Sequence, residues 1–149
     1  MKSITGNYFE SKVRFEKQTA EGELVKFVGL FVVDAMSFTE CEAKVTEEVA
    51  KLSNDFEVVT ETRAAYREIF FSDEECEKWF KVKVDFMTAD DNGKEKHSKN
   101  VYLVQANGID EAKRNVDDVL KGSMIEYSII GLNEINVEDV ILRKELKDE

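Results

Sequence analysis

Apolar and polar residues alternate along two stretches of the chain, residues 8–17 and residues 79–87. A period of two is expected of a β-strand that buries one face. Each stretch is followed by a polar segment that ends in glycine and then by a run rich in Val, Leu, Phe and Tyr, residues 26–33 and residues 98–105. Because such segments favour tight turns and such runs favour strands, the pattern predicts two β-hairpins.

A helical period follows each hairpin. Ser37 stands three residues before Glu40, the spacing of a capping box, and apolar side chains then recur every three or four residues as far as Leu52. Residues 109–120 carry the same stripe, and Gly122 is expected to end that helix. Third strands are predicted at residues 56–62 and 127–132, and short fourth strands, or bends of the third, at residues 66–71 and 137–142.

The chain aligns with itself without a gap at an offset of 71, which sets residues 7–74 against residues 78–145. Gly22 falls on Gly93, and aromatic residues and helix starts also coincide. Chance alignment of two amphipathic halves would not keep all of these in register. We interpret the pattern as an internal duplication.

The predicted fold class is α+β. It consists of two tandem ββαβ(β) units related by pseudo-twofold symmetry, each an antiparallel sheet covered by one helix, because the sheet face and the helix stripe can be buried against each other. The predicted boundaries are residues 1–74 for the first repeat, residues 75–77 for an acidic connector, and residues 78–149 for the second repeat with a short charged tail. The two repeats are expected to form one compact unit.

The composition and net charge of the chain argue against several classes of protein. The chain has 149 residues, of which 42% are hydrophobic, so it is expected to fold as a soluble domain. No run approaches the roughly 20 apolar residues of a membrane helix, and no signal segment opens the chain, so a cytoplasmic location without membrane contact is expected. Two cysteines and no proline argue against a disulfide scaffold, and a net charge of -11 argues against a coat for duplex DNA.

The sequence contains few residues that are suited to catalysis. The single histidine, His97, lies among lysines and is expected to be solvated. Cys41 lies on the apolar stripe of a predicted helix, whereas Cys76, beside acidic residues, is expected to be an exposed and unreactive thiol. The spacing of zinc ligands, the nucleophile turn of hydrolases and the phosphate-binding glycine motifs are absent. We therefore predict no catalytic residue, no metal, no cofactor and no enzymatic activity.

Aromatic and basic side chains combine on the first strand of each repeat. Rings beside cations can stack single-stranded bases and contact phosphates. Residues 78–104 also hold six lysines against four acidic residues, a local excess of positive charge. The nucleic-acid-binding candidates are Tyr8, Lys12, Arg14, Trp79, Lys81, Lys83, Lys94, Lys96 and Lys99. In an alternative interpretation, Tyr8 and Trp79 fill the interface between the repeats and the lysines only keep a sheet edge soluble.

Three strings in the chain are VDAMSFTE at residues 33–40, EIFFSD at residues 68–73 and KWFKVKV at residues 78–84. Together they resemble an uncharacterised family of about this length from anaerobic gut bacteria and their tailed phages and mobile elements. The resemblance spans nearly the whole chain. It implies a small intracellular protein in a phage-linked setting, and it brings no known active site.

Three functions stay open. The first is binding of single-stranded nucleic acid in a phage or mobile-element context. The second is a protein-interaction or host-modulating module that uses an acidic surface and exposed sheet edges. The third is capture of a small ligand between the two repeats. A monomer and a homodimer are both compatible with these functions.

Overall fold

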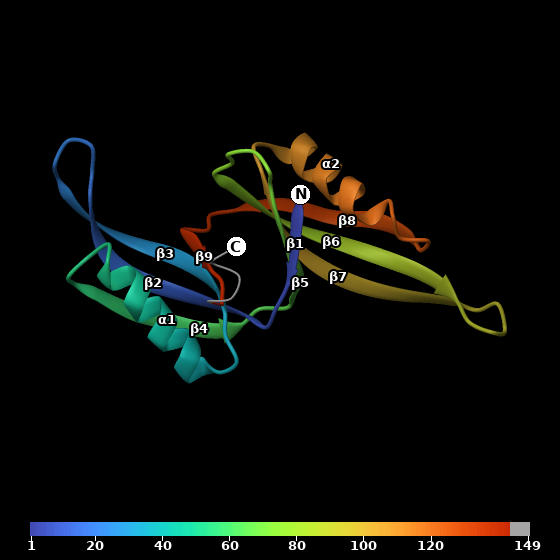
Figure 1. Ribbon diagram of the computed structural model, residues 1–149, viewed down its shortest axis with the longest axis horizontal. Coiled ribbons are helices and arrows are strands. Elements are labelled where there is room, and N and C mark those ends of the chain that lie inside the picture. The colour runs from blue at the N-terminus through green and yellow to red at the C-terminus, as the bar shows by residue number, and fades with distance from the viewer. Residues whose placement is uncertain (144–149) are drawn as a thin grey trace. The chain divides into compact units, whose positions relative to one another are not determined.

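The computed structural model describes residues 1–143, in which two helices and nine strands confirm the predicted α+β class (Figure 1). The strands form two sheets, and each sheet packs against one helix. The chain divides into two compact units. The first, here the α1 unit, holds residues 6–64 together with the described residues 136–143; the second, here the α2 unit, holds residues 1–5 and 65–135.

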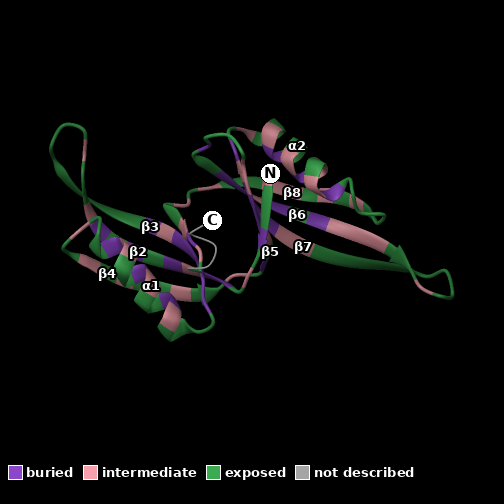
Figure 2. Cartoon of the chain, viewed as in Figure 1, coloured by how far each residue is buried: buried purple, intermediate pink, exposed green. Residues whose placement is uncertain are grey.

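The α1 unit has a four-stranded sheet with the order β4-β2-β3-β9. Its elements are β2 (Tyr8–Gln18), β3 (Leu24–Asp34), α1 (Phe38–Ala50), β4 (Phe56–Arg63) and β9 (Asp139–Ile141). Val13 and Phe31 from the sheet pack with Val45 and Val49 from the helix. These buried residues, purple in Figure 2, form the core of this unit.

The α2 unit has a five-stranded sheet with the order β1-β5-β7-β6-β8. Its elements are β1 (Lys2–Thr5), β5 (Tyr66–Phe71), β6 (Lys78–Ala89), β7 (Glu95–Ala106), α2 (Ile109–Leu120) and β8 (Glu126–Ile135). Phe80 and Val84 from the sheet pack with Ala112 and Val116 from the helix. The hydrophobic pattern gives no sign of β1, because its four residues are too few to show a period.

The two units correspond at the offset of 71 down to their strand registers. Val13 of β2 lies opposite Val58 of β4, and Val84 of β6 lies opposite Ile129 of β8, with a β-bulge beside each pair. The two hairpin turns contain the glycines with positive φ, Gly22 (87°) and Gly93 (79°). The correspondence is a property of the fold, whereas its origin by duplication and the pseudo-twofold relation stay predictions.

The two helices begin differently. The Ser37 hydroxyl accepts a hydrogen bond from the backbone N–H of Glu40 at 3.1 Å, as the capping-box spacing predicts. The Glu40 carboxylate accepts one from the backbone N–H of Met36 at 2.9 Å, and this bond, helped by Lys44, lowers the pKa of Glu40. At α2 the N-cap residue is Gly108, so no side chain caps that helix.

The last strand of each repeat belongs to the sheet of the other repeat. β5 follows β4 in the chain but pairs in parallel with β7, and β9 follows β8 but pairs in parallel with β3. The two pairings are equivalent, since Ile69 lies opposite Leu103 and Val140 lies opposite Val32. The expectation of purely antiparallel sheets is therefore wrong, and the compact units cut across the predicted boundaries at residues 74 and 78.

The length of a connection explains this exchange. β4 is an edge strand, and the open side of β3 lies three strand spacings from it, about 14 Å. Only Ala64 and Ala65 join β4 to β5, and a link of that length spans at most about 11 Å. β5 therefore cannot reach the open side of β3, the strand of its own repeat, and β9 pairs with that side instead.

Candidate functional site

The two aromatic residues predicted to stack nucleic-acid bases are buried. Tyr8 is 2% exposed and Trp79 is 7% exposed. Within the α2 unit, the Trp79 ring packs edge-on against Phe71, with ring centroids 5.6 Å apart and planes at 90°. Neither residue offers a free ring face to a base, so the predicted stacking platform is not present.

The basic candidates lie at the surface without forming one cluster. Lys81, Lys83 and Lys99 share the face of the α2-unit sheet that the helix does not cover, because the residues between them in β6 face α2. The Lys81 ammonium lies 5.6 Å from the centroid of the Tyr66 ring. The other candidates are dispersed: Lys94 in the β6–β7 turn, Lys96 on the opposite face of β7, and Lys12 and Arg14 in the α1 unit.

His97 has acidic partners in addition to solvent. Its Nδ1 lies 2.9 Å from a carboxylate oxygen of Asp85, on the neighbouring strand, and its Nε2 lies 3.7 Å from a carboxylate oxygen of Glu95. These contacts orient the imidazole on an exposed hairpin. Pairs of this exposure stabilise a protein only weakly.

Both cysteines are buried. Burial, together with the nearby Glu61 carboxylate, raises the pKa of the Cys41 thiol to about 11, so the thiolate is scarce at neutral pH. The prediction that Cys76 is exposed is wrong, because the Gln105 side chain donates a hydrogen bond to the carbonyl oxygen of Cys76 at 2.8 Å and holds the connector against β7. Among residues 1–143, no three His, Cys, Asp or Glu side chains come together in a way that would hold a metal ion.

The α1 unit has an uncovered strand edge. β2 pairs with the whole length of β3, but on the other side β9 pairs only with residues 31–33. The backbone N–H of Glu138 then donates to the carbonyl oxygen of Leu30 at 2.8 Å, where the contact ends. No described strand pairs with this side of residues 24–28, which we name the bare edge.

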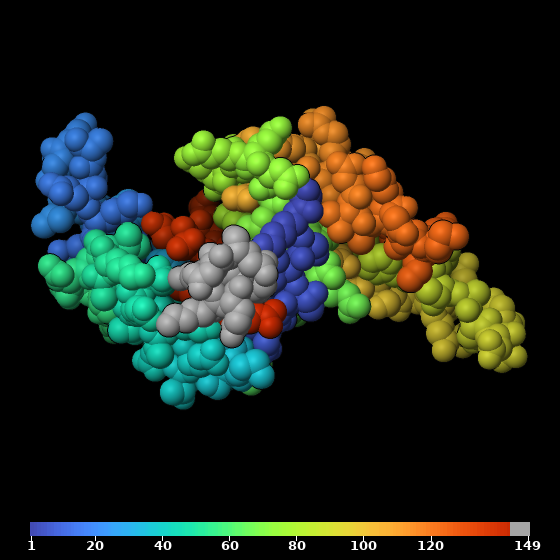
Figure 3. Space-filling model, viewed as in Figure 1, coloured from blue at the N-terminus to red at the C-terminus, as the bar shows by residue number. Residues whose placement is uncertain are grey.

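The bare edge carries large apolar side chains that are exposed. They are Leu24 (70% exposed), Val25 (37%), Phe27 (42%) and Val28 (58%), and only Lys26 between them is polar. This half of β3 is green in Figure 2, and the tip of its hairpin, in blue at the left of Figure 3, stands clear of the rest of the α1 unit. Exposed apolar residues gathered on one edge are typical of an interaction site.

The equivalent edge of the α2 unit is polar. β5 pairs with β7 only at residues 101–104, so residues 95–99 are uncovered in the same way. At the offset of 71, the four apolar residues of the bare edge correspond to Glu95, Lys96, Ser98 and Lys99. Charged side chains protect an open edge from pairing with other chains, and the bare edge has only one of them, Lys26.

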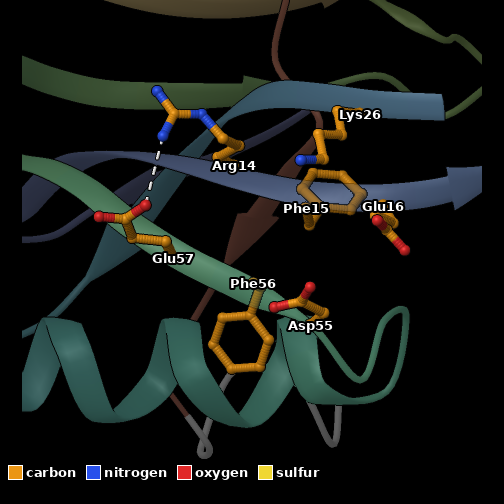
Figure 4. Close-up of a pocket in the computed structure, with 7 residues that line it drawn as sticks. All are labelled: Arg14, Phe15, Glu16, Lys26, Asp55, Phe56 and Glu57. Carbon is orange, nitrogen blue, oxygen red and sulfur yellow. Dashed lines mark hydrogen bonds and ion pairs between the residues drawn. The ribbon is translucent and has the colours of Figure 1, made fainter.

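Two cavities adjoin the hairpin that carries the bare edge. The first, of about 200 Å³, is partly lined by Phe56, which points toward α1, and is bordered by an ion pair between Arg14 and Glu57 at 3.2 Å (Figure 4). The second, of about 430 Å³, includes the exposed Leu24 and Leu52 in its lining. Leu24 of the bare edge and Leu52 of the loop that follows α1 therefore line the same cavity, among mostly polar residues.

A third cavity, of about 310 Å³, lies between α1 and β4 and is partly acidic. Phe38 and Glu42 line it from the helix, and Val59 and Glu61 line it from the strand. One carboxylate oxygen of Glu61 is buried without a hydrogen-bond partner, and burial, together with the charge of Glu42, raises the pKa of Glu61. The equivalent residue of the α2 unit is Leu132, so Glu61 stands where an apolar side chain also fits.

Of the two helices within residues 1–143, neither has both the length and the apolar character needed to cross a lipid bilayer.

Searches of curated proteins and of solved structures find no match to this chain. A family model described as a domain of unknown function, DUF4494, matches residues 7–143. This agrees with the resemblance to an uncharacterised family, while the bacterial and phage setting stays a prediction. Because the match spans both repeats, the chain belongs to the DUF4494 family.

Proposed function

We propose that this chain is a non-enzymatic protein-interaction module that binds an extended partner segment by strand addition at the bare edge. The proposal depends on the contrast between two equivalent uncovered edges, which we call half-edges. One is the bare edge, which is apolar and exposed, and the other is residues 95–99 of β7, which are polar and charged. A half-edge that needed only solubility would be expected to resemble residues 95–99. The apolar half-edge therefore favours a binding role.

Strand addition uses both the backbone and the side chains of β3. Backbone hydrogen bonds to the partner supply affinity, and side chains alternating between the two faces supply selectivity. Val25 and Phe27 lie on the face that packs against α1, because they share it with Phe31 of the core, whereas Leu24 and Val28 lie on the opposite face. A partner strand with apolar residues on both faces would cover all four side chains.

A peptide-library selection tests the proposal. Random peptides are selected against the wild-type chain and against a variant with Phe27→Ser and Val28→Lys, which carries the residues found at the equivalent positions of β7. We expect the wild type alone to retain peptides with alternating apolar residues, and the amide NMR shifts they cause to centre on residues 24–28. A Lys99→Ala variant serves as the control on the polar half-edge. Retention of the same peptides by the Phe27/Val28 variant, or shifts centred elsewhere, would contradict the proposal.

Binding of single-stranded nucleic acid is a second candidate, favoured by the shared face of Lys81, Lys83 and Lys99. With Tyr8 and Trp79 buried, this binding would depend on phosphate contacts and weaken steeply as salt rises. Titration of a labelled oligothymidylate at low and at physiological salt tests it, with a smaller salt slope expected for Lys83→Ala. No binding at low salt would exclude this candidate. Ligand capture between the repeats and a cytoplasmic location stay predictions.

A further inference from the structure

We infer that the strand added at the bare edge is the bare edge of a second copy of this chain, paired antiparallel about a twofold axis. The inference rests on the proposed function and names its partner. Such an interface is isologous, so the same patch has to complement itself. The sequence of the bare edge meets this condition.

Backbone groups on the bare edge point outward at alternate residues. In antiparallel pairs, residues that exchange backbone hydrogen bonds alternate with residues that do not. The carbonyl oxygen of Leu30 accepts its bond from Glu138, on the side away from β2. Val28, Lys26 and Leu24 therefore direct their N–H and C=O groups to that same side, where no described strand pairs with them.

One register satisfies these outward groups and also matches the side chains. With Lys26 opposite Lys26 of the second copy, Leu24 lies opposite Val28 and Val25 lies opposite Phe27, twice each by symmetry. All four exposed apolar residues of both copies then lie in apolar cross-strand pairs, two pairs on each face of a continuous sheet. A register shifted toward Leu30 would meet Glu138, which already occupies that position.

The one unfavourable pair is Lys26 with its own copy. Lys26 is paired with Glu16 in the register of β2 and β3, so an acidic residue neighbours each Lys26 in the sheet. On the equivalent edge of the α2 unit, the same register would set Glu95 against Lys99 and Lys96 against Ser98. Those pairs are polar and give no apolar contact, so the apolar self-complementary pattern is confined to the bare edge among the two half-edges.

Net charge sets the expected salt dependence. Each copy carries a formal charge of -11, so two copies repel at long range. Salt screens this repulsion, and a dimer held by apolar pairs should become tighter as salt rises. Binding to a basic partner or to nucleic acid would change in the opposite direction.

Analytical ultracentrifugation of the full chain tests the oligomeric state. We expect a concentration-dependent monomer–dimer equilibrium that is tighter at about 0.5 M NaCl than at about 0.05 M NaCl. The variant with Phe27→Ser and Val28→Lys should raise the dimer dissociation constant about tenfold or more, since it removes the apolar partner in every cross-strand pair. Lys99→Ala, on the polar half-edge, should leave the constant unchanged, and circular dichroism checks that both variants are folded.

Cysteine cross-linking tests the register. Backbone-bonded antiparallel pairs have Cα atoms about 5.5 Å apart, within the range of a disulfide. Lys26→Cys should therefore form a covalent dimer on mild oxidation, whereas His97→Cys, at the equivalent position of β7, should not. The two native cysteines are buried and should not interfere.

Each outcome decides between the alternatives. The inference that a second copy is the partner would be overturned if the chain were monomeric at every protein and salt concentration. It would also be overturned by a dimer that Lys26→Cys does not cross-link and that Phe27→Ser with Val28→Lys does not weaken. If such a chain still retained peptides at residues 24–28 in the library selection, the proposed function would stand and only the identity of the partner would fall. If neither experiment engaged the bare edge, both would fall.

Discussion

Replacing Glu61 by leucine should stabilise the α1 unit. The side chain is partly buried between α1 and β4, one of its carboxylate oxygens has no hydrogen-bond partner, and Glu42 adds like-charge repulsion. A buried polar group without a partner costs about 1–3 kcal/mol. Because Glu61 is only partly buried, we expect Glu61→Leu to raise the free energy of unfolding by about 1–2 kcal/mol at neutral pH. Leu132 at the equivalent position shows that the fold accepts this side chain.

The gain should depend on pH. Burial and the charge of Glu42 raise the folded-state pKa of Glu61 above its ordinary value of 4.5, so the folded protein binds the proton more readily than the unfolded chain. The penalty for an ionised Glu61 is complete above the folded-state pKa and disappears as the pH falls below 4.5, where both states are protonated. Glu61→Leu should therefore stabilise the protein more at pH 7 than at pH 4.

Urea unfolding followed by circular dichroism measures this effect at the two pH values. Tryptophan fluorescence is less suitable, because the only tryptophan, Trp79, lies in the other unit. Glu61→Gln removes the charge but keeps a polar side chain, so it should recover part of the gain. The reverse change in the α2 unit, Leu132→Glu, should destabilise the protein. A loss of stability in Glu61→Leu at pH 7, or the same gain at both pH values, would refute the reasoning.

Three further changes test other parts of the structure. Trp79→Ala should lower the free energy of unfolding by about 3–5 kcal/mol, because it removes a buried aromatic side chain, and urea unfolding measures the loss; a fall below about 1 kcal/mol would mean that the ring is not packed. Gly108→Ser should stabilise the protein by about 0.5–1 kcal/mol, because a Cβ at this position meets no atom within 4 Å and the Ser37 hydroxyl caps the equivalent helix α1. Thermal unfolding measures this gain, and an unchanged midpoint would contradict the prediction. His97→Ala should lower the free energy of unfolding by less than about 1 kcal/mol, because its pair with Asp85 is exposed, and a larger loss in urea would show that the pair matters more than its exposure suggests.

Most elements of the fold are visible in the sequence, because their periods are local. The alternation over residues 8–17 predicts β2, and the helical stripe after Ser37 predicts α1. The partner of β5 is not visible in the same way, since the hydrophobic pattern of a strand does not say which edge it joins. Its placement follows from the short link at Ala64 and Ala65, but only once the order of β4, β2 and β3 in the sheet is known.

The candidate site could be anticipated in kind but not in place. An interaction module that uses exposed sheet edges is one of the three functions that the sequence leaves open. The run at residues 26–33, however, predicts only a partly buried strand and does not say which edge is exposed. Its outer half is uncovered because β9 pairs with just residues 31–33, a length that the sequence does not fix. A signal was available in the offset of 71, which sets Val25 against Lys96. Burial of Trp79 was the alternative interpretation of the sequence, but the Phe71 ring that covers it could not be named, because alternation assigns a face and not a neighbour.

The exchange of strands sets the order in which the chain can finish folding as it is synthesised. Residues 6–64 leave the ribosome first, but the sheet they form has no neighbour beside β3 until residues 139–141 have been made. At translation rates of about 5–20 residues per second, this delay, the time needed to make residues 65–141, lasts about 4–15 seconds. Throughout it, the inner half of the β3 edge is as open to incorrect pairing as the outer half. In a cell, the nascent chain therefore passes through a stage at which the edge that stays half uncovered in the finished protein is uncovered along its whole length.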